Sequence, residues 1–101
     1  MTRIRLAPEA RTDLDNIWLY VARGSGSEDA ATRMVEAITS KFALFSRFPF
    51  IGKSLQAEKH PHVRTFPVHH YVIFYRPTGT ELRILRVIHA SRDAFAEFVE
   101  P

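Results

Sequence analysis

The sequence contains no cysteine, which excludes a disulfide framework, a thiolate metal site and a cysteine nucleophile. It contains only four glycines. None of them belongs to a Gly-x-Gly-x-x-Gly or Gly-x-x-x-x-Gly-Lys loop, which would hold a dinucleotide or a phosphate. No Gly-x-Ser-x-Gly turn is present to expose a catalytic serine. These absences argue against the common cofactor-dependent enzymes and hydrolases, and we expect no cofactor.

Long apolar runs are also absent, because nowhere do roughly 18 apolar residues follow one another. We therefore expect a protein that is neither exported nor inserted in a membrane, and the lack of cysteine fits a reducing cytoplasm. The net charge of +3 is a small excess, which suits an acidic partner without identifying one. The chain has 101 residues, of which 46% are hydrophobic and 12% aromatic, and this is enough for one core and too short for two domains. We therefore expect a single domain, 1–101.

The spacing of apolar residues predicts a strand and two helices in the first half of the chain. Ile4 and Leu6 alternate with arginines, which is typical of a short strand. Residues 8–23 and 28–48 carry apolar side chains every three or four positions, which predicts two amphipathic helices in a hairpin, with Ser27 capping the second. The helix carboxylates are expected on the solvated faces; they are Asp13, Asp15, Glu28 and Glu36.

The second half of the chain changes to β-branched and aromatic residues, which favour strands. Residues 50–61 show no period and predict a loop, Pro67 is expected to separate two strands, and 82–88 form a strand that is apolar on both faces. Residues 94–99 predict a short final helix. The expected fold class is therefore α+β: an N-terminal strand, a two-helix hairpin, an antiparallel sheet of three further strands and a short C-terminal helix.

Four histidines stand in two close pairs, His60 with His62 and His69 with His70. Adjacent residues on a strand point to opposite faces, so His69 and His70 would not share a ligand. No carboxylate or cysteine stands at a recognised ligand spacing beside them. We therefore expect no metal site.

Arginines are concentrated in the predicted sheet, where they offer paired hydrogen bonds to a phosphate or a carboxylate. Arg86 is the most unusual, because it is expected to share a strand face with Leu82, Ile84 and Ile88. Its guanidinium either emerges at the rim of a cleft or forms an internal ion pair. A solvated sheet face with some internal ion pairs remains an equal alternative. The candidate arginines are Arg64, Arg76, Arg83, Arg86 and Arg92.

Several short motifs, in this order and spacing, resemble the ParE/RelE toxins of bacterial type II toxin–antitoxin systems. The resemblance covers nearly the whole chain and implies two helices packed on an antiparallel sheet. The motifs are Leu6-Ala7-Pro8-Glu9-Ala10 leading to Asp13-Leu14-Asp15-Asn16-Ile17, Phe48-Pro49-x-x-Gly52, the run from Val63-Arg64 through Tyr71-Val72-Ile73-Phe74-Tyr75-Arg76, and Ile84-Leu85-Arg86-Val87-Ile88-His89-Ala90-Ser91-Arg92-Asp93.

The resemblance implies one of two activities. ParE-like members poison DNA gyrase, whereas RelE-like members cleave messenger RNA on the ribosome and use basic residues, Glu and a tyrosine near the C-terminus. Here the C-terminal aromatics are Phe95 and Phe98, which have no hydroxyl to transfer a proton. The chain therefore looks more like ParE, with the five candidate arginines as target-binding residues and no catalytic residue.

Two alternatives stay open beside the gyrase-directed toxin. A ribosome-dependent mRNA endonuclease of RelE type would take its cations and proton shuttle from Lys53, Arg64, Arg86 and His89. A non-toxic interaction domain would keep the fold and the antitoxin contact without a target.

The resemblance also implies a cognate, ParD-like antitoxin that wraps the toxin in a hetero-oligomer. Its expected docking surface includes Trp18, Val21 and Met34 on the helical hairpin, although core packing explains these three side chains equally well.

Overall fold

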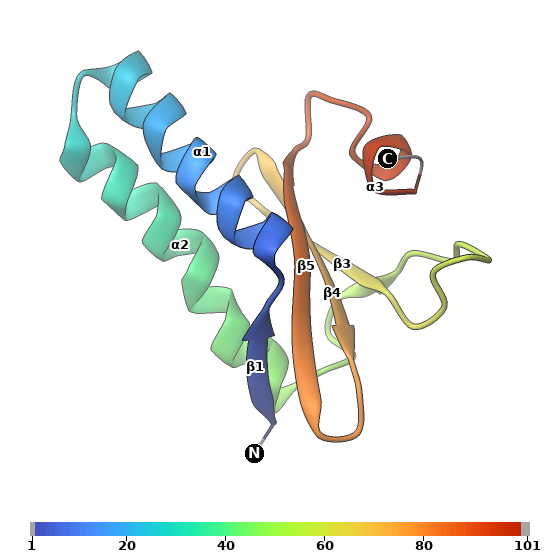
Figure 1. The fold of residues 1–101 in the computed structure, drawn as a ribbon. Helices are drawn as coiled ribbons and strands as arrows, with labels where there is room; N and C mark the ends of the chain where they lie inside the picture. Colours follow the sequence, from blue (N-terminus) through green and yellow to red (C-terminus); the bar gives the residue numbers. More distant parts are fainter. Residues whose placement is uncertain (1, 100–101) are drawn as a thin grey trace.

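The computed structural model describes residues 2–99 and confirms the predicted order of strand, helical hairpin, sheet and short helix (Figure 1). Within that part of the chain, neither helix of the hairpin nor the short last one has the length and apolar character needed to cross a lipid bilayer. The elements are β1 (Arg3–Leu6), α1 (Pro8–Ser25), α2 (Glu28–Arg47), β2 (Lys53–Ser54), β3 (Arg64–Val68), β4 (Tyr71–Pro77), β5 (Glu81–His89) and α3 (Ala94–Val99).

The turn between α1 and α2 is built by two residues with complementary roles. Gly26 ends α1 with a left-handed φ of 70°, a conformation that glycine adopts without strain, and its N–H donates to the carbonyl of Ala22. Ser27 begins α2 by accepting a hydrogen bond from the N–H of Ala30 on its side-chain oxygen, at 3.1 Å. The two long helices therefore run back along each other.

Replacing Ser27 by alanine should lower the free energy of unfolding by about 1 kcal/mol, because an N-terminal N–H of α2 loses its acceptor. Ser40→Ala is the matched control, since Ser40 is exposed inside the same helix, where alanine is the better helix former. Urea denaturation of both variants measures the difference. An equal effect of the two substitutions would show that the cap contributes nothing.

The sheet has five strands in the order β1-β5-β4-β3-β2. β1 runs parallel to β5, and the other neighbouring pairs are antiparallel, as expected for the second half of the chain. β2 is a two-residue strand within the segment for which a loop is predicted, and it pairs with the first residues of β3. The strand that is apolar on both faces, β5, lies inside the sheet between β1 and β4.

Pro67 lies inside β3, so the predicted separation of two strands at this residue is wrong. β2 pairs only with Arg64 and Thr65, and among the described residues no strand covers the outer edge of β3 at Pro67. Proline has no backbone N–H and is tolerated at such an edge. The turn to β4 falls instead at His69 and His70, where His69 has a φ of 53°. These two histidines are turn residues, not neighbours on a strand.

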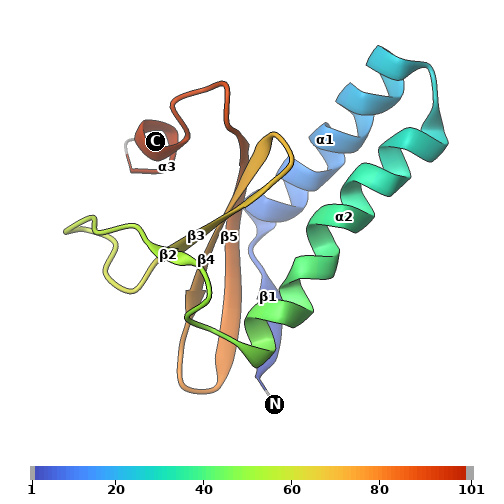
Figure 2. The same ribbon diagram turned by 180° about the vertical axis from the view of Figure 1, so that it is seen from behind.

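The sheet separates two apolar clusters, with α1 and α2 on one face and α3 on the other (Figures 1 and 2). The larger cluster fills the space between the sheet and the helical hairpin, and its fully buried side chains include Ile38, Phe45, Ile73, Tyr75, Leu82 and Ile84. The smaller one lies under α3 and contains Val63, Phe74, Ile88 and Ala94. Two clusters explain why β4 and β5 are apolar on both faces.

A bulge in β5 places Arg86 on a different face from the one predicted. Tyr75 pairs with Ile84 and Phe74 pairs with Arg86, so Leu85 is an extra residue in the ladder. The extra residue shifts the alternation of side chains along the rest of the strand. Leu82, Ile84 and Val87 consequently belong to the cluster under the hairpin, whereas Ile88 belongs to the cluster under α3. The predicted shared face of Leu82, Ile84, Arg86 and Ile88 is therefore wrong.

Candidate functional site

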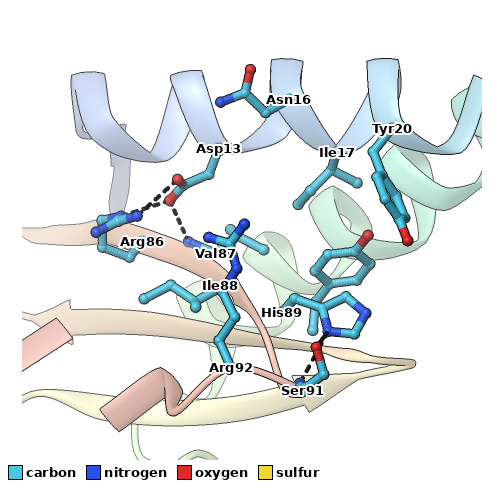
Figure 3. A pocket seen from close by; sticks show the side chains of 11 residues that line it. Asp13, Asn16, Ile17, Tyr20, Arg86, Val87, Ile88, His89, Ser91 and Arg92 are labelled. Carbon is cyan, nitrogen blue, oxygen red and sulfur yellow. Dashed lines mark hydrogen bonds and ion pairs between the residues drawn. The ribbon is translucent and has the colours of Figure 1, made fainter. Parts of the chain in front are cut away.

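An open cleft of about 420 Å³ lies between α1 and the C-terminal end of β5 (Figure 3). α1 contributes one wall, and β5 with the loop that leads to α3 contributes the other. Polar and ionisable groups from both walls meet in it. The lining residues are Asp13, Asn16, Ile17, Tyr20, Tyr71, Arg86, Val87, Ile88, His89, Ser91 and Arg92.

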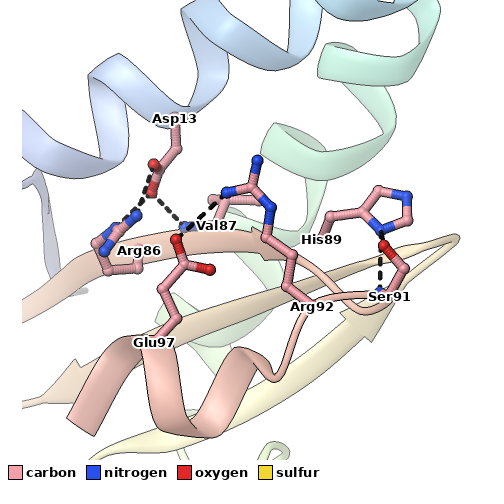
Figure 4. Close-up of polar contacts among 7 residues, drawn as sticks. All are labelled: Asp13, Arg86, Val87, His89, Ser91, Arg92 and Glu97. Carbon is pink, nitrogen blue, oxygen red and sulfur yellow. Dashed lines mark hydrogen bonds and ion pairs between the residues drawn. The ribbon is translucent and has the colours of Figure 1, made fainter. Parts of the chain in front are cut away.

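The two walls are joined by an ion pair between Asp13 of α1 and Arg86 of β5 (Figures 3 and 4). Arg86 donates from Nε to Asp13 Oδ2 at 2.8 Å and from a terminal nitrogen to Asp13 Oδ1 at 3.0 Å. Both side chains are largely shielded, with 13% of Asp13 and 26% of Arg86 exposed. A bidentate guanidinium–carboxylate pair fixes both partners in direction as well as in distance.

Asp13 also accepts a backbone hydrogen bond from β5, at an edge where β1 no longer pairs with that strand. β1 pairs with β5 only as far as Ile84, and the N–H of Ala7 makes the last bond, to the Ile84 carbonyl at 2.9 Å. The chain then turns into α1, and no other strand in the described part of the chain pairs with the following part of the β5 edge. There the N–H of Val87 donates to Asp13 Oδ2 at 2.8 Å. One carboxylate therefore satisfies both a backbone donor and a guanidinium.

The prediction that Asp13 lies on a solvated helix face is wrong, because this side chain points at the sheet. A signal for this was present in the sequence. Asp13 stands three residues after Ala10 and four before Ile17, both of which are buried, so it belongs to the core-facing stripe of α1. Asp15, Glu28 and Glu36 are exposed, as predicted.

The hydrogen bond to Asp13 raises the pKa of Arg86 above its ordinary value, and this effect outweighs burial, which acts in the opposite direction. Arg86 therefore stays cationic, and its charge is balanced by Asp13. Of the two possibilities open from the sequence, a cleft rim or an internal ion pair, the structure combines both: the guanidinium lines the cleft while its Nε and one terminal nitrogen are bonded to Asp13.

His89 is held at the other end of the cleft by Ser91 (Figure 4). Its Nδ1 accepts the backbone N–H of Ser91 at 3.0 Å and lies 2.6 Å from the Ser91 hydroxyl. Because Nδ1 is an acceptor, the neutral imidazole carries its proton on Nε2. The ring also packs edge-on against Tyr71, with centroids 5.0 Å apart. Burial raises the pKa of the Tyr71 hydroxyl, with a further contribution from Tyr20.

Arg92 is the most accessible cation of the cleft, with 70% of its side chain exposed. Among residues 2–99 it makes a single ion-pair contact, of 3.3 Å, with Glu97 of α3, and an exposed pair of this kind is weak. The cleft thus offers a guanidinium and the tyrosine hydroxyls as donors. This set suits a carboxylate or another anion from a partner.

The four residues of the predicted nuclease alternative are not gathered in this cleft. Arg86 and His89 line it, whereas Lys53 and Arg64 lie on β2 and β3, on the far side of β4. Arg64 is occupied there: it donates to the carbonyl of Gly52 at 2.7 Å and its guanidinium lies 4.9 Å above the centre of the Phe50 ring. The structure therefore divides this set into two separate pairs.

Comparison with known proteins decides the family of the chain. Residues 4–94 match the family described as the ParE toxin of the type II toxin–antitoxin system parDE. The chain belongs to the ParE toxin family. It is similar to toxin ParE1 of Caulobacter vibrioides, with 32% identity over 95% of this chain and 97% of that protein. Toxin ParE3 of the same organism is 29% identical over 84% of this chain and 83% of its own length.

Solved structures confirm the ParE/RelE type of fold. A chain of the chromosomal ParDE system from P. aeruginosa superposes with a TM-score of 0.75, at 24% identity, over 88% of this chain and 96% of that one. A chain of the toxin–antitoxin complex RelBE2 from Mycobacterium tuberculosis superposes with a TM-score of 0.63 at 27% identity, over 87% of this chain and 96% of that one. The protein is a type II toxin of ParE kind, and its fold is shared with the RelE branch.

The last aromatic residue of this ParE-family chain is part of the core. Phe98 of α3 stacks on Phe74 with ring centroids 4.5 Å apart and an angle of 6° between the planes. On another side its ring lies 4.8 Å from His60. Phe98 therefore anchors α3 to the sheet and presents no polar atom.

The three predicted antitoxin-binding residues are half-buried in the ParE-family hairpin. Val21 and Met34 pack against the core between the helices and the sheet. Trp18 donates from its indole nitrogen to the hydroxyl of Thr32 on α2, at 3.1 Å. Each thus has a packing role inside the toxin, and its contact with an antitoxin stays a prediction.

The five predicted target-binding arginines lie in three places on the ParE-family toxin. Arg86 and Arg92 line the cleft, and Arg64 stands apart on β3. Arg76 and Arg83 face each other on β4 and β5, and Arg5 of β1 pairs with Arg83 from the other side. Sequence reasoning missed Arg5, because only the parallel pairing of β1 with β5 brings it there. The role of these residues in target binding stays a prediction.

Proposed function

We propose that this toxin inhibits DNA gyrase by binding it, and that a cognate ParD-like antitoxin neutralises the toxin by direct contact. The observation that carries the proposal is the division of the candidate nuclease residues between the cleft and the β2/β3 edge. General acid–base cleavage of RNA needs its acid, base and cations around one phosphate. In the proposed mechanism the toxin instead occupies gyrase, so that the DNA-cleavage step of gyrase itself is trapped.

The position of Phe98 supports the same proposal. A C-terminal tyrosine near the reacting phosphate could transfer a proton, whereas Phe98 is stacked on Phe74 and has no hydroxyl. The similarity to two toxins named ParE points in the same direction.

The test is a supercoiling assay with purified gyrase, relaxed plasmid and increasing toxin. We expect supercoiling to be inhibited and linear DNA to accumulate, and we expect both effects to disappear when the antitoxin is added first. Unchanged supercoiling, together with transcripts cut in the ribosomal A site on expression, would favour the endonuclease of RelE type instead. Normal growth on expression of the toxin alone would favour the non-toxic interaction domain.

Arg92 is the cleft arginine best placed to bind a target, because it is exposed and weakly paired. Arg92→Ala should raise the toxin concentration needed for half-inhibition of gyrase by about tenfold, the effect of losing one well-placed interface arginine. The melting temperature should not change. Arg23→Ala, which removes an exposed arginine of α1, is the matched control. Equal inhibition by the two variants would remove Arg92 from the proposed target surface.

The antitoxin part of the proposal draws on the solved relatives, which belong to a ParDE toxin–antitoxin system and to the RelBE2 toxin–antitoxin complex. A basic toxin with an amphipathic helical hairpin suits an acidic, apolar segment that folds on binding, because charge steers the encounter and apolar burial holds the complex. Co-expression of the neighbouring gene product with a tagged toxin tests it. Recovery of the toxin without that partner would contradict it.

A further inference from the structure

Three arginines stand side by side across three strands at the end of the sheet that α3 leaves open. Arg5 of β1 pairs with Arg83 of β5, and Arg83 pairs with Arg76 of β4. Leu82 and Ile84, which flank Arg83, belong to the core under the hairpin, as does Tyr75, which precedes Arg76, and Leu6, which follows Arg5, packs against that core. The three arginines therefore face the opposite side of the sheet. Arg3 stands two residues before Arg5, on the same face. We call Arg5, Arg83 and Arg76 the arginine row.

Within residues 2–99, the positive charge of the arginine row is only partly balanced by carboxylates. Glu81 is the carboxylate that reaches it, at 3.7 Å from Arg5 and 3.6 Å from Arg83, and both contacts are long and exposed. Arg76 is half-buried, and its Nε has no hydrogen-bond partner in the part of the chain that the structure describes. Like charges directly opposite each other in a sheet are destabilising. The row therefore carries a cost in stability that an external anion would relieve.

We infer that the arginine row binds the phosphodiester backbone of duplex DNA. Neighbouring strands are about 4.8 Å apart, so the row spans about 10 Å. Duplex DNA carries a negative charge every ~1.7 Å along its axis, so several phosphates lie within reach of a row of this length. Guanidinium groups suit phosphate oxygens because their donors are planar and paired.

The surroundings of the row favour DNA over an acidic protein segment. A protein segment that folds on binding gains most of its affinity from apolar anchors, and such anchors are found in pockets. The exposed side chains of the row are those of Arg5 and Arg83, and the pocket beside them is small, about 210 Å³, with Leu6, Ala7, Pro8 and Leu85 in its lining. Ile4 of β1 is partly exposed but alternates with Arg3 and Arg5, so it points to the opposite face. The other large exposed apolar side chains lie away from the row: Leu19 and Tyr20 on α1, Phe48, Phe50 and Ile51 after α2, and Phe95 on α3. Contacts made by charge alone, without sequence readout, are typical of binding to the DNA backbone.

DNA binding by the arginine row goes beyond the proposed binding of gyrase. In the cell the bound duplex would be a segment held by gyrase, and this one step rests on the proposed function. DNA binding is tested with the purified toxin and a fluorescent 20-base-pair duplex, without gyrase, by anisotropy over a series of salt concentrations. The variant is Arg5→Gln/Arg76→Gln/Arg83→Gln, which keeps polar side chains of similar length. The control is Arg11→Gln/Arg23→Gln/Arg33→Gln, which removes three exposed arginines from the helices and changes the net charge equally.

We expect the row variant to bind DNA more than tenfold more weakly at low salt. The slope of log affinity against log salt is negative, and its magnitude should decrease by about 3, one for each lost phosphate contact. The control should keep most of the affinity and slope. Circular dichroism melting should show the row variant at least as stable as the wild type, because repulsion is relieved.

Three outcomes would overturn the inference: no binding by the wild-type toxin at 50 mM salt, an equal loss in both triple variants, or tighter binding of poly-glutamate than of duplex DNA. The last would assign the row to an acidic protein. Because this titration contains no gyrase and the supercoiling assay scores inhibition, either proposal can fail while the other stands.

Discussion

Replacing Asp13 by alanine should lower the free energy of unfolding by about 2–4 kcal/mol, the loss expected when one partner of a largely buried ion pair is removed and a backbone donor is left unpaired. Asp13 accepts two bonds from Arg86 and one from the N–H of Val87. Alanine removes the acceptor of all three of these N–H donors. Chemical denaturation followed by circular dichroism measures the effect.

Asp15→Ala is the matched control, because Asp15 is exposed on the same helix and the gain in helix propensity is the same. We expect its free energy of unfolding to stay within about 0.5 kcal/mol of the wild type or to rise. If the two alanine variants unfold at the same denaturant concentration, Asp13 does not hold α1 to β5.

Arg86→Ala separates a structural role of Arg86 from a role in binding. Asp13 would keep its bond to the N–H of Val87, so the loss of stability should be smaller than that of Asp13→Ala. In a double-mutant cycle the two residues should couple by about 1–3 kcal/mol, as directly paired residues do. If Arg86→Ala is fully folded but no longer inhibits gyrase, Arg86 also binds the target.

Gly52→Ala should cost about 2–4 kcal/mol, because overpacking and the loss of a buried hydrogen bond act together. A Cβ at residue 52 would lie 2.6 Å from the hydroxyl of Tyr75 and 2.8 Å from the carbonyl oxygen of Thr65. The Tyr75 hydroxyl accepts the N–H of Gly52 at 2.8 Å and donates to the carbonyl of Pro49 at 2.9 Å. Tyr75 is fully buried, so neither group can move aside easily.

Gly79→Ala serves as the control for Gly52→Ala, since a Cβ at Gly79 meets no described atom within 4 Å. Gly79→Ala should change the free energy of unfolding by no more than about 0.5 kcal/mol. Tyr75→Phe tests the same contact from the other side and should cost about 1–3 kcal/mol, because the N–H of Gly52 loses its acceptor. A Gly52→Ala protein as stable as Gly79→Ala would contradict the close approach.

Burial raises the pKa of the Tyr75 hydroxyl above its ordinary value of 10.0, although the Gly52 N–H and Arg64 act in the opposite direction. The fold therefore favours the neutral phenol. This contribution to stability is complete below pH 10 and is lost as the pH rises through the higher pKa of the folded state. The stability of the wild type should fall more steeply above pH 10 than that of Tyr75→Phe, with Tyr71 supplying the remaining slope.

Tyr75 and Gly52 also show how the resemblance and the structure complement each other. The motif Phe48-Pro49-x-x-Gly52 could be recognised in the sequence without a reason for its glycine. The reason is the phenol of Tyr75, which comes from β4 and bonds on both sides of the segment. A contact between residues 23 positions apart has no signature in local spacing.

The sequence by itself determined the helices, the order of the elements, the α+β class and the toxin family. These features depend on local periods and short motifs: a stripe every three or four residues buries one side of α1 and α2, and Ser27 and Gly26 mark the turn between them. Tertiary structure alone decided the pairing of β1 with β5, the bulge at Leu85 and the ion pair of Asp13 with Arg86. Each joins residues distant in the chain, and a single inserted residue in a ladder reverses which side chains face the core. The arginines could therefore be counted in the sequence, whereas their division into a neutralised pair, a cleft cation and a partly balanced row arises only when the strands are side by side.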